Sequence, residues 1–155
     1  MKRALVFWVL AFVVSLNGPA QAQPAQKKEP AHVSDKERLI GAWHLVSIGE
    51  ARAGGNADTK GTLIYTRDGH MSVQLMYPAS QTALSNEYVL NGYEASFGSY
   101  EVNEETHIVT HHVQGSVTRG LVGKSLRRVY QFSKGQLIIR PVQPDEHWSV
   151  IWEHD

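Results

Sequence analysis

Two adjacent histidines, His111 and His112, are the side chains whose type and spacing most directly suggest chemistry. They lie in the run 109–114, where apolar and polar residues alternate as they do in a β-strand. Because neighbouring strand residues point to opposite faces, the pair cannot share one metal ion on a regular strand. The alternation predicts that His111 faces inward, beside Val109 and Val113, and that His112 faces outward.

An inward His111 has several possible roles. It could bond a ligand, act as a general acid or base, or bind haem axially. It could equally be a core histidine satisfied by a neighbouring tyrosine or carboxylate. If the protein is an enzyme, His111 is the expected catalytic residue.

Three tyrosines, Tyr65, Tyr100 and Tyr130, occupy positions that are also predicted to face the interior. A phenol presents an apolar wall with a hydrogen-bonding tip. Such side chains suit a ligand-binding cup and the packing of a core equally well. Together with Val73 and His111, they form the predicted ligand-binding set.

Composition and motifs exclude several classes of protein. The sequence has no cysteine, which excludes thiol catalysis, thiolate metal sites and disulfides. It contains no Gly-x-Ser-x-Gly, P-loop or dinucleotide fingerprint. The other histidines lack the spacing of a metal site, so we predict neither a metal nor a cofactor. The 15 basic and 15 acidic side chains balance, which gives no electrostatic case for binding nucleic acid.

The elements that must position these residues begin at Ser34. Ser34-Asp-Lys-Glu37 has the pattern of a capping box, in which each end residue satisfies a free backbone N–H of the other. It predicts a short helix over residues 35–40, with Leu39 and Ile40 turned inward and Gly41 ending it. From Trp43 the period changes to two, with Trp43, Leu45 and Ser47 on one face and Ile48 on the other.

The run 61–76 is the clearest hairpin in the chain. Arg67-Asp68-Gly69 suits a three-residue turn closed by a left-handed glycine. This turn pairs Thr66 with His70 and gives one apolar face. A two-residue loop would mix polar and apolar side chains on that face, so we prefer the three-residue turn. The predicted inward residues are Leu63, Tyr65, Met71, Val73 and Leu75, whereas Ser72 and Gln74 face outward.

Further strands are expected at 96–102, 108–114, 125–132, 136–141 and 148–153, and residues 85–94 could form a short helix or a lid. About eight short strands at regular spacing are typical of a sandwich or a barrel. We favour the barrel, because the chain lacks the devices that protect exposed sheet edges. The predicted fold class is therefore all-β: a closed, antiparallel barrel of about eight strands with a short N-terminal helix.

The first 22 residues have the pattern of a secretory signal peptide. Lys2 and Arg3 precede the apolar run 4–16, and Ala20-Gln-Ala22 provides a cleavage site. Cleavage after Ala22 would leave a disordered linker at 23–33 and a domain at 34–155. The mature chain would have 13 basic and 15 acidic side chains, a net charge of −2. We expect a periplasmic or secreted protein that binds no membrane.

Five stretches, taken together in their order and spacing, resemble the bacterial lipocalin-like domain family. They are 39–47 (LIGAWHLVS), 61–72, 97–102, 109–115 and 123–132. The resemblance implies a lipocalin-type barrel that binds a small molecule. It also implies a structural role for Trp43, within Gly41-Ala-Trp43, and for Arg128, because the lipocalin signature stacks such an arginine on the tryptophan to close the barrel.

The resulting functional hypothesis is an exported barrel that binds an apolar or amphipathic small molecule in its lumen. Two alternatives stay open. The protein could be a cyclase or isomerase that acts on a small hydrophobic intermediate, or a filled barrel that acts on other proteins through its surface. Barrels of this kind host unrelated activities, so the fold alone does not choose among them.

Overall fold

The computed structural model describes residues 33–49, 58–78 and 85–155. The predicted signal peptide lies outside these ranges, as does all but the last residue of the predicted linker. In the described part of the chain, no helix is long and apolar enough to cross a lipid bilayer.

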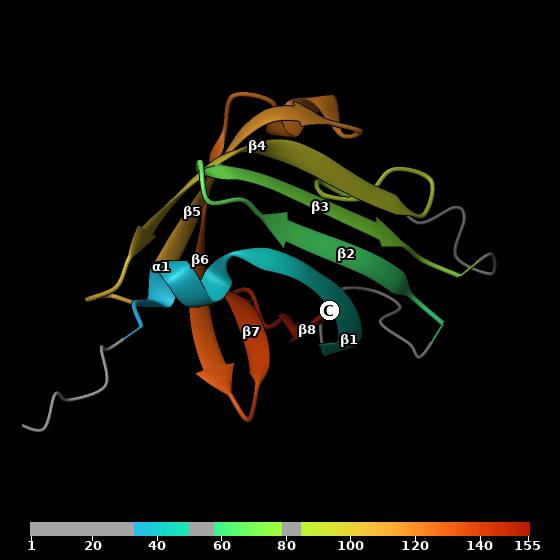
Figure 1. Ribbon diagram of the computed structural model, residues 1–155. Coiled ribbons are helices and arrows are strands. Elements are labelled where there is room, and N and C mark those ends of the chain that lie inside the picture. Colours follow the sequence, from blue (N-terminus) through green and yellow to red (C-terminus); the bar gives the residue numbers. More distant parts are fainter. Residues whose placement is uncertain (1–32, 50–57, 79–84) are drawn as a thin grey trace, which may run out of the picture. The chain divides into compact units, whose positions relative to one another are not determined.

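Eight antiparallel strands form a closed barrel, in which each strand pairs with its neighbours along the chain and the last pairs with the first. Figure 1 shows this sheet rolled around one interior, with the helix α1 (Asp35–Leu39) beside it. The predicted fold class is confirmed. The strands are β1 (Gly41–Gly49), β2 (Lys60–Tyr65), β3 (His70–Met76), β4 (Tyr93–Asn103), β5 (Ile108–Ser116), β6 (Ser125–Ser133), β7 (Gln136–Pro141) and β8 (Ser149–His154).

The β2–β3 hairpin has the predicted register. Leu63 pairs with Val73 and Tyr65 with Met71, and the Thr66 N–H donates to the His70 carbonyl at 2.9 Å. Gly69 has a φ of 89°, the left-handed conformation that this turn requires. The turn therefore fixes which residues of β2 and β3 face the interior.

Strand β1 departs from its predicted alternation. Leu45 pairs with Trp152, but Ser47 pairs with Ile151, so the register shifts between these residues. Such a bulge inserts one extra residue and reverses the facing of those that follow. Ile48 is consequently buried and Ser47 exposed, the reverse of the prediction.

The helix α1 packs against one end of the barrel, which we call the helix end. Ser34 caps α1 by accepting a hydrogen bond from the Glu37 N–H at 3.2 Å. Only this half of the predicted capping box is seen, because the Glu37 carboxylate accepts from Arg67 instead, at 2.7 Å. Leu39 is fully buried, and its carbonyl accepts from the Trp43 indole N–H at 2.8 Å. Polar and apolar contacts together fix α1 on the barrel.

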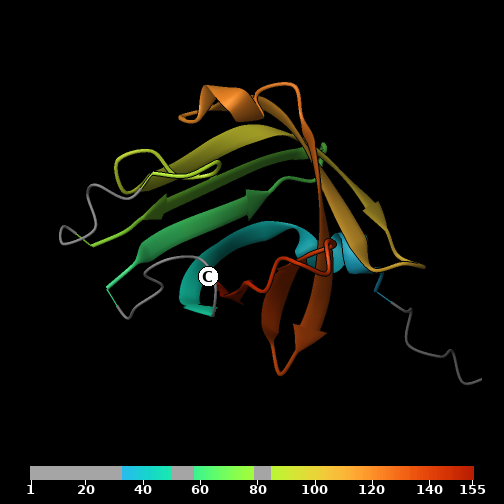
Figure 2. The same cartoon turned by 180° about the vertical axis from the view of Figure 1, so that it is seen from behind.

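The opposite end, the loop end, contains the segments that follow β3, β5 and β7. The segment 85–92 and the 3-10 helix η2 (Arg119–Leu121) lie on the side of the barrel away from α1 (Figure 2). The helix expected within 85–94 does not form: Asn86 Oδ1 instead accepts from the N–H groups of Tyr88 and Val89, which folds this stretch as a turn. Val89 is buried there.

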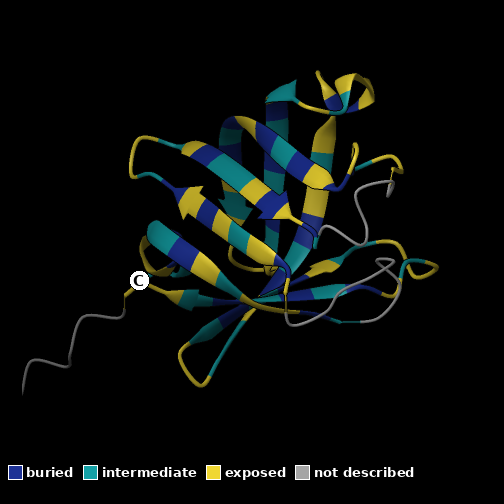
Figure 3. Cartoon of the chain, turned by 90° about the vertical axis from the view of Figure 1, so that its right-hand side faces the viewer, coloured by how far each residue is buried: buried dark blue, intermediate teal, exposed yellow. Residues whose placement is uncertain are grey.

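Burial alternates along the strands, as Figure 3 shows by its banded colouring. One apolar cluster extends through the interior from the helix end to the loop end, and about half of its members come from the predicted inward positions. The largest fully buried side chains are Tyr65, Tyr130, Leu39, Leu63, Leu137, Val89 and Val109.

Candidate ligand-binding cavity

A cavity lies inside the barrel toward the loop end. Its volume is about 50 Å³, and it opens partly to solvent. It is therefore narrow. Ten lining side chains are aliphatic or aromatic: Leu63, Val73, Leu75, Tyr88, Leu121, Leu126, Ile139, Trp148, Val150 and Trp152. Four are polar: Glu94, Ser96, His111 and Arg128.

Arg128 supplies a positive charge to this cavity from β6. The side chain is only 6% exposed. Its guanidinium carbon lies 5.0 Å from the ring centroid of Trp148 and 5.4 Å from that of Tyr88. Both distances are within the range of cation–π attraction. The two rings therefore favour the charged group in a largely apolar space.

The hydrogen bonds of Arg128 use little of its capacity. A guanidinium has five N–H donors, and one of them, on Nη1, donates to the Arg127 carbonyl at 3.0 Å. Within residues 33–49, 58–78 and 85–155, no carboxylate lies within ion-pair distance of it. Glu94 lines the same cavity from β4 and has an interaction partner of its own. Among the described residues, no ion pair joins it to Arg128.

His111 faces this cavity, as predicted, and contacts Tyr65. The Tyr65 hydroxyl lies 2.7 Å from His111 Nε2. Burial lowers the pKa of His111 from 6.5 to about 3, and the positive charge of Arg128 adds to the effect. Burial also raises the pKa of Tyr65, with a further contribution from Tyr100. Both rings are therefore neutral at neutral pH.

The tautomer of His111 follows from this pairing. Among the described residues, Nε2 of His111 is the one hydrogen-bond partner of the Tyr65 hydroxyl, so we assign the O–H as donor and Nε2 as acceptor. The imidazole proton then resides on Nδ1. No described residue accepts from Nδ1, which leaves this N–H as a second donor beside the cavity.

The indole of Trp152 adds a third donor. Trp152 lines the cavity from β8, and its Nε1 is buried with no hydrogen-bond partner in the described part of the chain. Buried polar groups normally have partners. The cavity thus combines an apolar wall with lining residues whose N–H donors lack acceptors among the described residues.

The outward partner in the histidine pair behaves as predicted. His112 Nδ1 lies 2.9 Å from Ser125 Oγ and His112 Nε2 lies 3.7 Å from a Glu101 carboxylate oxygen, both on the outer surface. The two histidines therefore share no site. No group of three or more potential metal ligands occurs among the described residues.

Of the five residues predicted to bind ligand, the structure places two, Val73 and His111, on the cavity wall. Tyr65 lies behind His111, to which it is bonded. Tyr100 and Tyr130 lie toward the helix end, where their hydroxyls donate to the Thr66 carbonyl and to Asp35 at 2.9 and 3.1 Å. The geometry therefore gives these two tyrosines a structural role.

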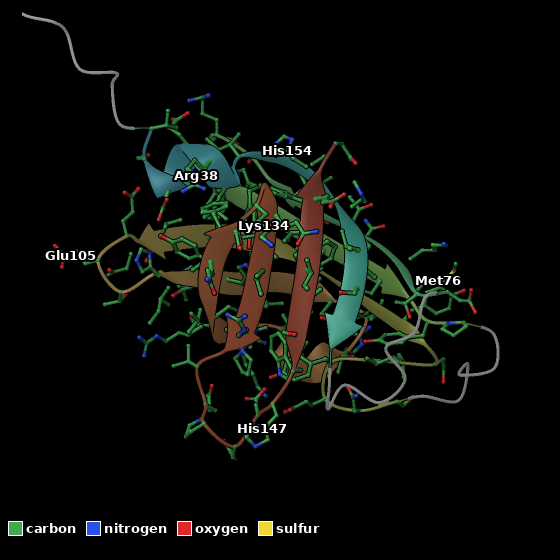
Figure 4. The ribbon with its side chains drawn as sticks, turned by 90° about the horizontal axis from the view of Figure 1, so that it is seen from below. Arg38, Met76, Glu105, Lys134, His147 and His154 are labelled. Carbon is green, nitrogen blue, oxygen red and sulfur yellow. The ribbon has the colours of Figure 1, made fainter. Side chains whose placement is uncertain are left out.

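The expected stacking of Arg128 on Trp43 is not seen. Trp43 lies at the helix end, where its ring contacts Phe132 and His154. An arginine does lie against aromatic side chains there, but it is Arg38, 3.8 Å from the ring centroid of Phe132. Figure 4 shows Arg38 near this end and His147, in the segment before β8, near the other. Arg128 points toward the loop end instead.

Sequence reasoning missed most of the cavity wall at the loop end. Tyr88 and Glu94 lie at or near a segment without strand periodicity, which gives no indication of facing. Two signals were present. Arg128 is two residues before the inward Tyr130, so the alternation of the strand places both on the same face. Trp148 is spaced in the same way from Val150 and Trp152. An arginine at an inward strand position is a feature that could have indicated the site.

Comparison with known proteins places this geometry in context. A family model described as a lipocalin-like domain matches residues 40–153. No curated protein matches the chain. The wild-type fluorescent protein UnaG is similar in structure at 13% sequence identity, with a TM-score of 0.41, over 77% of this chain and 98% of that one. A single-site mutant of UnaG gives 14% identity, a TM-score of 0.42, and coverage of 77% and 97%.

Proposed function

Because the chain belongs to the lipocalin-like domain family, we propose that it binds one small apolar or amphipathic molecule in the lumen of its barrel. The observation that carries the proposal is the cavity at the loop end, whose wall is mainly aliphatic and aromatic. Binding sites for small molecules are typically concave and apolar, with a few fixed polar groups. An eight-stranded barrel has space for side chains and at most one small ligand.

The narrowness of the cavity bears on the shape of the ligand. A slender molecule such as an alkyl chain requires smaller movements of the lining side chains than a broad one does. A wide, rigid ring system would require Tyr88 and Trp148 to move. The proposal therefore favours a ligand with an unbranched or narrow apolar part.

A neutral alkyl probe tests this function directly. We expect 1-decanol to bind the mature chain with a stoichiometry of one in isothermal titration calorimetry. Val73→Trp fills the cavity from β3 and should abolish the binding. Gln74→Trp adds the same ring to the outer face of the same strand and should leave it unchanged.

Two results would overturn the proposal. One is an absence of decanol binding in the wild-type chain; the other is equal binding by the two tryptophan variants, which would locate the alcohol outside the lumen. Native mass spectrometry of protein purified from its natural host complements the test. We expect a bound molecule that is lost on denaturation.

The enzyme alternative receives less support from the geometry. A general acid or base works best when its pKa lies near the working pH. Burial holds the pKa of His111 near 3, so the imidazole has no proton to donate as an acid at neutral pH and is a weak base. The cavity itself argues against the other alternative, a completely filled barrel.

We also propose that the chain is exported and cleaved after Ala22. The charge of Lys2 and Arg3, the apolar run 4–16 and the small residues of the cleavage site support this. N-terminal sequencing of the protein from its natural host should begin at Gln23. A protein that retains Met1 and stays in the cytoplasm would contradict export.

A further inference from the structure

We propose that Arg128 is the head-group site of the lumen ligand, and that this head group is a carboxylate. The inference rests on the proposed lumen binding and specifies the class of ligand. It depends on the burial of the guanidinium, on its unused hydrogen-bond donors and on the groups around it.

The burial of Arg128 is costly without a ligand. A guanidinium stays charged in proteins, and burial of a charge is unfavourable unless the charge is paired and hydrogen-bonded. Arg128 is 94% buried, taken from its 6% exposure. The rings of Tyr88 and Trp148 stabilise the positive charge, but a ring face supplies no oxygen atom to accept its N–H groups.

The remaining donors match a carboxylate in number and shape. After the bond to the Arg127 carbonyl, four of the five N–H groups of Arg128 have no acceptor in the described part of the chain. The planar guanidinium can bind two carboxylate oxygens with two parallel hydrogen bonds. A lysine at this position would offer no such fork.

The groups around Arg128 also favour a ligand head group that accepts hydrogen bonds. His111 and Trp152 line the same cavity, and the Nδ1–H of the first and the buried Nε1–H of the second have no acceptor in the described part of the chain. The field of Arg128 reaches His111, because its charge contributes to lowering the pKa of that imidazole. Glu94 is the one carboxylate among the described lining residues, and it lies on β4, beyond ion-pair distance from Arg128.

A ligand with an apolar chain and a carboxylate would satisfy both parts of the cavity at once. The chain would lie among the aliphatic residues contributed by β2, β3 and β7, represented by Leu63, Val73 and Ile139. The carboxylate would lie at Arg128. This arrangement compensates the buried charge, which no described carboxylate of the protein does.

The test compares two probes that differ only in the head group. We expect decanoate to bind the mature wild-type chain at least about tenfold more tightly than 1-decanol near neutral pH, because charge-assisted hydrogen bonds in a buried site strengthen binding. Arg128→Met should abolish this preference, measured as the ratio of the decanoate and decanol affinities within the same variant. Arg127→Met, on the exposed face of the same strand, is the matched control and should retain it.

The outcomes separate the two proposals. If decanol binds in the lumen but decanoate binds no better, or if Arg127→Met and Arg128→Met lose the preference equally, the carboxylate site is wrong while lumen binding stands. If neither probe binds, lumen binding itself fails. Should Arg128→Met fail to fold, Arg128→Lys decides: it keeps the charge but loses the fork, and should retain only part of the preference.

Discussion

An arginine lies against aromatic rings at both ends of the barrel, but only one of the two has a carboxylate partner among the described residues. At the helix end, Arg38 lies over Phe132 and donates to Asp35 at 3.0 Å. At the loop end, Arg128 lies near Trp148, and no described carboxylate is within ion-pair distance of it. The helix end satisfies its charge internally, whereas the loop end leaves a charge that a ligand can satisfy.

The histidine–tyrosine pairs differ in the same way. His107 and Tyr130, at the helix end, meet edge to face with ring centroids 5.6 Å apart, and both lie close to the Asp35 carboxylate. His111 and Tyr65 contact each other beside the cavity, and among the described residues no carboxylate bonds to either of them. The comparison teaches that similar side chains form closed polar groups where an acid completes them, and we propose that they bind a ligand where no described acid does.

The largest expected effect on stability comes from a substitution at the helix end, and it tests whether the two ends have separate roles. Trp43→Ala should lower the free energy of unfolding by about 3–5 kcal/mol, because it removes a buried indole that packs beneath α1. Urea unfolding monitored by circular dichroism measures the loss. Where the variant is folded, its preference for decanoate over decanol should be unchanged. A changed preference would show that the two ends are not separate in role.

The second prediction concerns the stability of the fold at acidic pH. The folded pKa of His111 is depressed to about 3, so as pH falls below 6.5 the unfolded chain takes up this proton and the folded chain does not. Stability is therefore full above the unfolded pKa and declines as pH falls toward 3. The slope is up to about 1.4 kcal/mol per pH unit for this one group.

His111→Gln isolates that contribution. Its unfolding free energy should decline less than that of the wild type by up to about 2 kcal/mol between pH 6.5 and about pH 5. Urea titrations at the two pH values provide the comparison. Equal declines in the two proteins would mean that the pKa of His111 is the same in the folded and unfolded chains, which would contradict a buried, neutral imidazole.

The third prediction compares the two arginines by stability. Arg38→Met should lower the free energy of unfolding by about 0.5–1 kcal/mol, since it removes a half-exposed ion pair. Arg128→Met should leave it unchanged or raise it by up to about 2 kcal/mol, because it removes a buried charge that has no carboxylate partner among the described residues. A loss of more than about 2 kcal/mol for Arg128→Met would favour the structural role implied by the lipocalin signature over the ligand role.

The smallest effect also comes from the helix end. Hydrogen bonds to the carbonyls of Asp155 and Ile40 raise the pKa of His154 above 6.5. Its stabilising contribution is therefore present below the unfolded pKa and is lost as pH rises through the folded value. His154→Asn should remove this weak decline in the range just above pH 6.5. An unchanged profile of stability against pH would contradict the assignment.

The sequence predicted the barrel because the hydrophobic period and the turns are local signals. Gly69 determined the register of the β2–β3 hairpin, and that register placed Val73 in the lumen. The same alternation placed His111 inward and His112 outward. A bulge interrupts the alternation between Leu45 and Ser47, and there the prediction was wrong. No residue type in this strand marks the position of the bulge, so nothing in the sequence signalled it.

The site could be predicted only in part. The alternation along a strand tells which face of the sheet a residue occupies, but not how far along the barrel axis it lies. Tyr100 and Tyr130 occupy inward positions, yet both lie toward the helix end. Arg128 also occupies an inward position, but the lipocalin signature assigned it to Trp43, at the wrong end of the barrel. Tyr88 comes from a turn, whose placement depends on tertiary contacts rather than on a periodic pattern.

A crystal structure of the mature chain with decanoate tests the central claim most directly. We predict that the alkyl chain occupies the lumen near Val73 and Ile139, with a carboxylate oxygen within hydrogen-bond distance of Arg128. Decanoate bound on the outer surface, or an Arg128 side chain paired with a carboxylate of the protein itself, would contradict the account.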